Sequence, residues 1–87
     1  MIRIDGLSWD ERAEDHIARH SVRFEEVEQA VEGRLHVRRS GSYMLVIGQA
    51  HSGRYLTVVL DHERDGIWYP VTARDSTASE RRLGRRT

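Results

Sequence analysis

The sequence contains no cysteine and no lysine, and its 87 residues include a single proline. Without cysteine the chain can form neither a disulfide nor a thiolate metal site, which is consistent with a reducing compartment such as the cytoplasm. Without lysine, every basic side chain is arginine, which stays protonated and stabilises negative charge but is a poor proton acceptor. Any general base must therefore be His, Asp, Glu or Tyr.

Long apolar stretches are also missing. No run approaches the ~20 residues that span a bilayer, and no segment has the pattern of a signal peptide. We therefore expect a soluble, cytoplasmic protein with no membrane partner. The length predicts one domain over residues 1–87, with a core small enough that a partner could add to its stability.

The zero net charge conceals an asymmetry between the two parts of the chain. Residues 1–32 hold four Arg and nine acidic residues, whereas residues 33–87 hold ten Arg and five acidic residues. Overall neutrality argues against indiscriminate nucleic-acid binding, but the basic part can still present a local patch that binds phosphate. The alternative is that the two parts pair in the fold and cancel.

The first third of the chain has helical periodicity. Residues 2–4 alternate in the manner of a short strand, and the capping-box pattern from Ser8 to Glu11 predicts a helix over residues 9–19. A second helix is predicted over Phe24–Glu32, with Gly33 as its C-terminal cap.

From residue 34 onward the period changes to that of strands. Strands are predicted over residues 34–39, 43–50, 54–62 and 67–73, and the third is placed centrally because both of its faces are largely apolar. Pro70 argues for an edge position or a bulge in the last strand. A capping box from Thr77 to Glu80 then opens a basic final helix. The predicted fold is α+β: two N-terminal helices packed on an antiparallel β-meander sheet, followed by a C-terminal helix.

Candidate functional residues gather where the last strand meets the final helix. Arg74 is placed on the same side of the strand as Trp68, and Arg81 and Arg82 follow in the helix. Phosphodiester cleavage needs cations beside a phosphate that gathers negative charge, and arginine forks supply them without a metal. A basic row of Arg34, His36 and Arg38 could extend this site into a groove for RNA, with Trp68 stacking on a base. In the structural alternative, Arg74 pairs with an acid of the first two helices and the helix arginines are solvated.

Two histidines four residues apart are the candidate bases. His16 and His20 share one side of the first helix, but no third ligand is evident, so we expect no metal site and no cofactor. His16 is expected to be partly buried over the sheet, whereas His20 remains a candidate general base.

The succession of motifs resembles the BrnT family of bacterial toxins. The resemblance is carried by Trp9-Asp10, by residues 17–20 and 24–27, by the strand of residues 53–59, and by residues 71–74 leading to Glu80-Arg81-Arg82. It implies a RelE-like fold and a small ribonuclease that halts translation. It also implies neutralisation by a cognate antitoxin, often one with a DNA-binding domain, so DNA would be contacted only through that partner. RNA and the ribosome are the other implied partners.

Two positions depart from the family pattern. Ser21 follows His20 where the family has glycine, which argues against a left-handed turn after the first helix. Gly84 replaces an aromatic residue and is expected to shorten the last helix.

The leading hypothesis is a metal-independent endoribonuclease toxin. In it, Arg74 and Arg81 stabilise the phosphate, Arg54 orients it, and His20 or Glu80 moves the proton of the 2′-hydroxyl. A non-catalytic module that binds a partner or nucleic acid is the main alternative. A regulatory DNA binder is less favoured, because the sequence lacks a helix-turn-helix pattern.

Overall fold

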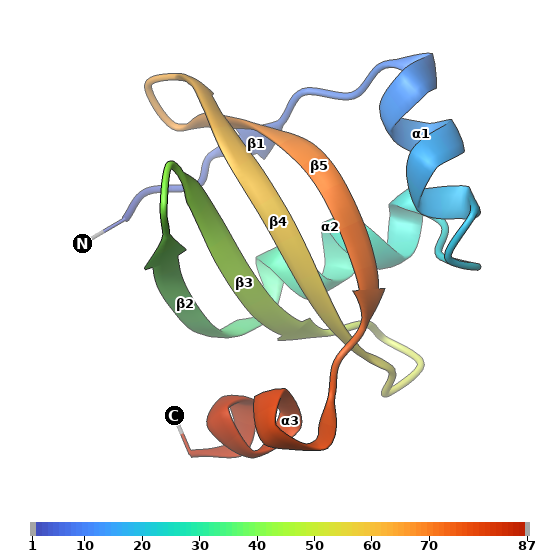
Figure 1. The fold of residues 1–87 in the computed structure, drawn as a ribbon, viewed down its shortest axis with the longest axis vertical. Helices are drawn as coiled ribbons and strands as arrows, with labels where there is room; N and C mark the ends of the chain where they lie inside the picture. The colour runs from blue at the N-terminus through green and yellow to red at the C-terminus, as the bar shows by residue number, and fades with distance from the viewer. Residues whose placement is uncertain (1, 87) are drawn as a thin grey trace.

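The computed structural model describes residues 2–86, which form one five-stranded sheet and three helices (Figure 1). The strands lie in the order β1-β5-β4-β3-β2; β1 runs parallel to β5, and the other neighbours are antiparallel. The elements along the chain are β1 (Gly6–Leu7), α1 (Glu11–Ala18), α2 (Phe24–Glu32), β2 (Arg34–Ser40), β3 (Tyr43–Gln49), β4 (Tyr55–Arg64), β5 (Ile67–Asp75) and α3 (Ala78–Arg85). The predicted α+β class is confirmed, β4 is central as expected, and the bounds of β2–β5 agree with the prediction to within two residues. None of the described helices is long and apolar enough to cross a membrane.

One face of the sheet carries the core. Ile17 of α1 and Val27 of α2 are fully buried there, together with side chains of β3, β4 and β5: Val46, Leu56, Val58, Leu60 and Ala73. The backbone of α2 packs so closely on Gly48 of β3 that a Cβ built at Gly48 would lie 1.8 Å from the Ala30 carbonyl oxygen. Glycine at position 48 is therefore a condition of this close helix–sheet contact.

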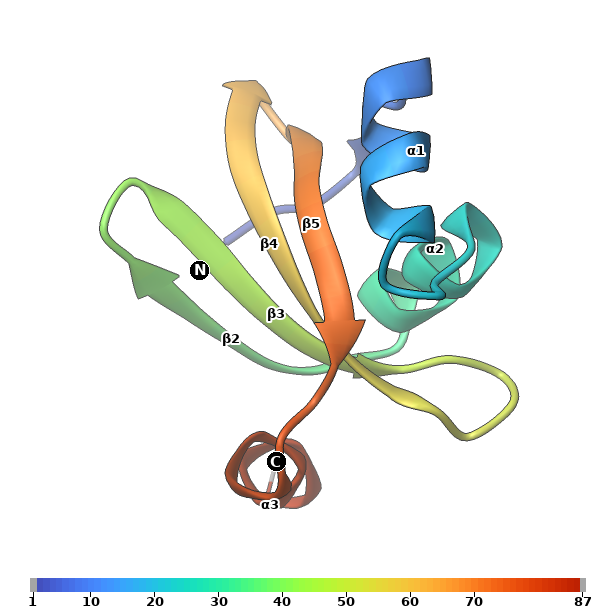
Figure 2. The ribbon, with the colours of Figure 1, turned by 45° about the vertical axis from the view of Figure 1, so that its right-hand side comes forward.

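The helix α3 packs against the opposite face of the sheet. A Cβ on Gly84 would lie 3.3 Å from Ile47, the neighbour of Gly48 in β3, and successive strand residues point to opposite faces. In Figure 2, α1 and α2 lie on one side of the strands and α3 lies apart from them, beyond the end of β5. Away from α3 this second face is exposed or half-buried. We call that part the open face; it is formed by Tyr43, Leu45, Val59, Asp61, Tyr69, Val71 and Thr72.

A β-bulge in β5 reverses the alternation of that strand. Val59 pairs with Thr72 and Leu60 pairs with Pro70, so Val71 is the extra residue. Trp68 consequently faces the core, with 9% of its surface exposed, whereas Arg74 points to the opposite face. The prediction that these two side chains share a side is wrong. The predicted bulge or edge position of Pro70 is confirmed. Pro70 adjoins the bulge, and because β1 pairs with β5 only as far as Trp68, the Pro70 position has no neighbouring strand on that side within residues 2–86.

A second irregularity divides the predicted basic row of β2. Arg34 pairs with Gly48 and His36 pairs with Ile47, although Gly48 and Ile47 face opposite sides. Arg34 therefore lies on the α2 side, where its Nη1 donates to the Val31 carbonyl oxygen at 3.0 Å, while His36 and Arg38 face the α3 side. The prediction of one continuous row containing Arg34 is wrong.

The N-terminal segment also differs locally from expectation. Residues 2–4 form no strand, and β1 lies at Gly6–Leu7 instead. Asp10 rather than Ser8 caps α1, because its Oδ1 accepts the Ala13 amide at 2.7 Å. The helix occupies Glu11–Ala18, and His16 is exposed on it rather than partly buried.

The two departures from the family pattern are accommodated by the backbone. Ser21 has φ of 59°, so the left-handed turn forms with serine in place of glycine. Gly84 lies inside α3, which continues to Arg85 and is not shortened there. The Phe24–Glu32 helix, its Gly33 cap and the Thr77–Glu80 capping box are confirmed.

Candidate functional site

The junction of β5 and α3 is built around a bidentate ion pair. Arg74 Nη1 lies 2.7 Å from Glu80 Oε1, and Arg74 Nη2 lies 2.9 Å from Glu80 Oε2. The strand orients Arg74 opposite Thr57 of β4, and the capping box turns Glu80 back toward the strand end. The acid that pairs with Arg74 thus comes from α3, and the expectation that it would come from the first two helices is wrong.

Glu80 is held as a carboxylate by four donors. Besides Arg74, the Thr77 amide donates at 2.8 Å and the Thr57 hydroxyl donates at 3.0 Å. The Arg74 hydrogen bonds, followed by those from Thr77 and Thr57, outweigh burial and lower the pKa of Glu80 to about 2. While these bonds persist, Glu80 is too weak a base to take a proton near neutral pH.

The buried hydroxyl groups of Thr57 and Ser76 form a hydrogen-bonded chain that ends on the Glu80 carboxylate. The Thr57 and Ser76 oxygens lie 2.8 Å apart, and both side chains are buried. Because the single hydroxyl proton of Thr57 is donated to Glu80, Ser76 donates to Thr57. The resulting chain fixes the position of Glu80 relative to the sheet.

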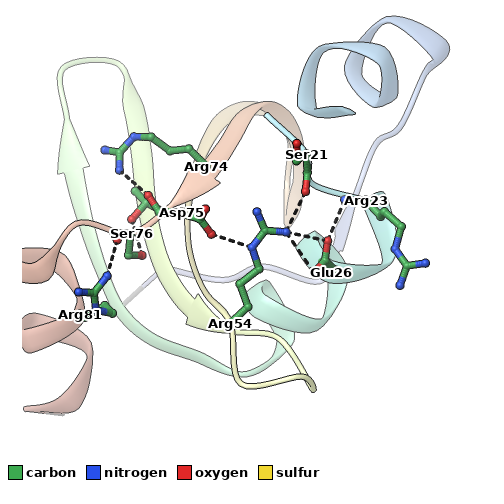
Figure 3. A network of polar contacts seen from close by, with 9 residues as sticks. Ser21, Arg23, Glu26, Arg54, Arg74, Asp75, Ser76 and Arg81 are labelled. Carbon is green, nitrogen blue, oxygen red and sulfur yellow. Dashed lines mark hydrogen bonds and ion pairs between the residues drawn. The ribbon is translucent and has the colours of Figure 1, made fainter. Parts of the chain in front are cut away.

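Arg81 adds a second cation beside the pair. Its Nη1 donates to the Ser76 carbonyl oxygen at 2.9 Å, and its side chain is half-buried (Figure 3). Arg82 is exposed one position further on and bonds the Ser79 hydroxyl at 3.2 Å. Arg74, which is 43% exposed, and Arg81 therefore present two guanidinium groups at one joint. Together they could bind an anion such as a phosphate.

Arg54 ties three parts of the chain together. Its Nε lies 2.6 Å from Asp75 Oδ1, and its Nη1 donates to Glu26 Oε1 at 3.1 Å and to the Ser21 carbonyl oxygen at 2.9 Å (Figure 3). The bond to Arg54 lowers the pKa of Asp75, and the backbone bond from Arg23, followed by Arg54, lowers the pKa of Glu26. Arg54 thus holds the left-handed turn and α2 against the end of β5, one residue from Arg74.

The other predicted site residues lie elsewhere. His20 is exposed at the end of α1, with its ring 5.7 Å from that of His16. Trp68 is buried and donates its indole N–H to the Arg3 carbonyl oxygen at 2.9 Å, so it presents no ring face for stacking on a base. Arg38 is exposed on the same face as Arg74 but on β2: it lies about 14 Å away across three strand spacings, in register with Thr72, and Arg74 is two residues further along β5. Arg34 lies on the other face.

The structure therefore brings together Arg74, Glu80 and Arg81, with Arg54 linked to them through Asp75. The sequence reasoning missed Thr57 and Ser76, because hydroxyls within apolar or turn segments give no pattern that identifies them. Within residues 2–86, His, Asp and Glu side chains form no group of three that could hold a metal ion.

Comparisons with known proteins add one finding to this geometry. No protein-family model matches the chain, and no curated protein sequence matches it. The structure is similar to the 1.1 Å crystal structure of the Brucella abortus ribonuclease toxin BrnT, with a TM-score of 0.64 and 17% sequence identity, covering 83% of this chain and 96% of that one. At 17% identity the likeness establishes a shared fold. It supports the resemblance to BrnT toxins that the sequence suggests, at the level of the fold alone.

Proposed function

We propose that the chain is the toxin of a bacterial toxin–antitoxin pair and cleaves RNA as a small endoribonuclease. The observation that carries this proposal is the pair of guanidinium groups, Arg74 and Arg81, at the β5–α3 joint. The fold shared with a ribonuclease toxin supports the same conclusion. The proposed site of action is the cytoplasm. The proposed partners are an antitoxin protein and the ribosome.

In this proposal the RNA phosphate replaces Glu80 on Arg74. A phosphate offers the same bidentate geometry as a carboxylate, and the partial exposure of Arg74 leaves it accessible. Arg81 would stabilise the charge that gathers on the phosphate, and Arg54 would hold the end of β5 in place through Asp75. Arg82 and the more distant Arg38 would contact neighbouring backbone phosphates.

Release of Glu80 would also supply the base. Without its two bonds from Arg74, the carboxylate pKa would rise toward its ordinary value, because those bonds are the main cause of its depression. Glu80 could then accept the proton of the 2′-hydroxyl, whose oxygen attacks the phosphorus to form a 2′,3′-cyclic phosphate as the bond to the 5′-oxygen breaks. The departing 5′-oxygen would take its proton from solvent water. His20 is the second candidate base, and the step requires no metal.

The test is cleavage of a single-stranded RNA by purified protein in the presence of EDTA. We expect cleavage by the parent chain and a loss of about 100-fold or more in Arg74→Ala, since the charge of this side chain acts where charge develops. Arg85→Ala is the matched control, because it removes an exposed arginine at the far end of α3, away from the joint, and should leave the rate unchanged. Equal rates for Arg74→Ala and the parent would contradict the central role of Arg74.

The engagement of Glu80 by four donors favours a second candidate function. A carboxylate with a pKa of about 2 suits a structural cap better than a base, so the joint could bind RNA or a protein without cutting it. Growth arrest on expression, combined with intact RNA in the cleavage assay, would select this non-catalytic module.

A further inference from the structure

A row of three side chains crosses the open face at the end away from α3. Tyr43 of β3 pairs with Asp61 of β4, and Asp61 pairs with Tyr69 of β5. Side chains directly opposite one another on one face have Cβ atoms about 4.5–5.5 Å apart. The Asp61 side chain therefore lies between two tyrosine side chains in this row.

A pocket of about 480 Å³ opens between this row and α1. Besides the row itself, it is lined by Val71 of β5 and by side chains of the α1 segment: Asp10, Arg12, Ala13 and His16. The Tyr69 hydroxyl donates to Asp10 Oδ1 at 3.0 Å, so this tyrosine is fixed in the wall of the pocket.

Asp61 differs from the other acid of the pocket in having no partner within the described part of the chain. Asp10 Oδ1 accepts from both Tyr69 and the Ala13 amide, whereas no residue between 2 and 86 hydrogen-bonds or pairs with the exposed Asp61 carboxylate. Tyr43 is 41% exposed beside it. An unpaired carboxylate next to an exposed aromatic ring is a favourable site for a cationic side chain, because ion pairing and the cation–π interaction then act together.

The charge around the pocket is complementary to a cation. Its lining holds two carboxylates, one guanidinium and the imidazole of His16, so with His16 neutral the carboxylates are in excess. Burial, the bond to Asp10 and the nearby charge of Glu63 all raise the pKa of the Tyr69 hydroxyl, while Arg12 lowers it. Such surroundings disfavour a phosphate, in contrast to the arginine-rich joint at the opposite end of the same face.

We infer that this end of the open face is a docking site for a protein partner that inserts an arginine or lysine side chain between Tyr43 and Tyr69 onto Asp61. Apolar residues beside that basic side chain would cover Leu45, Val59 and Val71, which are half-buried. This inference does not depend on ribonuclease activity.

The probe is the peptide acetyl-Leu-Arg-Leu-amide, compared with the same peptide carrying citrulline, which has nearly the same shape but no charge. Both are titrated into ¹⁵N-labelled protein, and binding is followed through the amide signals of Tyr43, Asp61 and Tyr69. We expect the arginine peptide to shift these signals and the citrulline peptide to bind at least about tenfold more weakly. Asp61→Asn should weaken the arginine peptide by a similar factor.

Asp65→Asn is the matched control, because Asp65 is an exposed acid of the adjacent turn that pairs with Arg3 instead. It should bind the arginine peptide as the parent does, and the spectra themselves report whether each variant is folded. Equal binding of the two peptides, no shift at millimolar arginine peptide, or full binding by Asp61→Asn would overturn the inference.

Two further outcomes would assign the site to another occupant and so overturn it. A single-stranded RNA oligonucleotide that shifts the same three signals at lower concentration than the peptide would indicate a nucleic-acid subsite. Concentration-dependent association of the parent in sedimentation, abolished by Asp61→Asn, would indicate a second copy of this chain.

Discussion

Replacing Glu80 with glutamine should remove a pH-dependent part of the stability of this protein. Glutamine keeps the shape of the side chain and can still accept the Thr77 amide bond, but it carries no charge for Arg74. Glu80 has a folded pKa of about 2 against an ordinary value of 4.5, and its side chain is only 13% exposed. At about 1.4 kcal/mol per pKa unit, the charged form contributes about 3 kcal/mol to the free energy of unfolding.

The sign of the pH dependence follows from the depressed pKa. The unfolded chain binds a proton to Glu80 near pH 4.5 and the folded chain only near pH 2, so the contribution is complete above pH 4.5 and is lost as the pH falls toward 2. Of the 3 kcal/mol, about 2 should be lost by pH 3. Asp75 and Glu26 also have lowered pKa values, but they contribute equally to the parent and to Glu80→Gln.

The assay is urea unfolding of both proteins at several pH values between 7 and 3, followed by circular dichroism. The parent should be more stable than Glu80→Gln by about 3 kcal/mol at pH 7 and by about 1 kcal/mol at pH 3. A difference that stays constant across this range would refute the reasoning, because it would show that the charge of Glu80 is not what Arg74 and its neighbours stabilise.

Three further substitutions, the first with Gly6→Ala as its control, test the backbone and the contacts around the site by urea unfolding at neutral pH. Gly48→Ala should cost at least about 3 kcal/mol or prevent folding, because the new Cβ meets backbone of α2; Gly6→Ala, whose Cβ would lie at an ordinary 3.5 Å from Ile67, should cost less than about 1 kcal/mol. Ser21→Gly should raise stability by about 0.5–1 kcal/mol, since it relieves a left-handed serine; an unchanged or lowered midpoint would contradict this. Arg54→Ala should cost about 2–3 kcal/mol, because it removes the cation that pairs with both Glu26 and Asp75, and a loss below about 0.5 kcal/mol would show that the network is not stabilising.

The parts of the fold that could be predicted are those specified by local patterns. The Thr77–Glu80 capping box and the apolar stripe of Phe24–Glu32 depend on residues within one or two helical turns, and both were placed correctly. Alternation located β2–β5, since each strand has its own apolar face. At α1 the same reasoning failed, because Ser8 and Asp10 both satisfy the preference for a cap and the sequence does not decide between them.

The site itself was less predictable, because its contacts join distant positions. Arg54 was expected to orient the phosphate, yet its partners in the structure are Ser21, Glu26 and Asp75, which are 21–33 residues away in the chain. The partner of Arg74 is only six residues away, yet it was assigned to the wrong element, because Glu80 had been given the role of a capping residue.

The bulge at Val71 has a consequence for how insertions and deletions would act on this chain. Strand β5 keeps Trp68 in the core and Arg74 on the far face only because one extra residue lies between them. Deletion of Val71 would restore simple alternation and turn either the tryptophan out to solvent or the arginine into the apolar interior. The side of the sheet on which Arg74 lies is thus determined by the number of residues in the strand, whatever their composition, and a change of one residue in length would be more damaging than most substitutions.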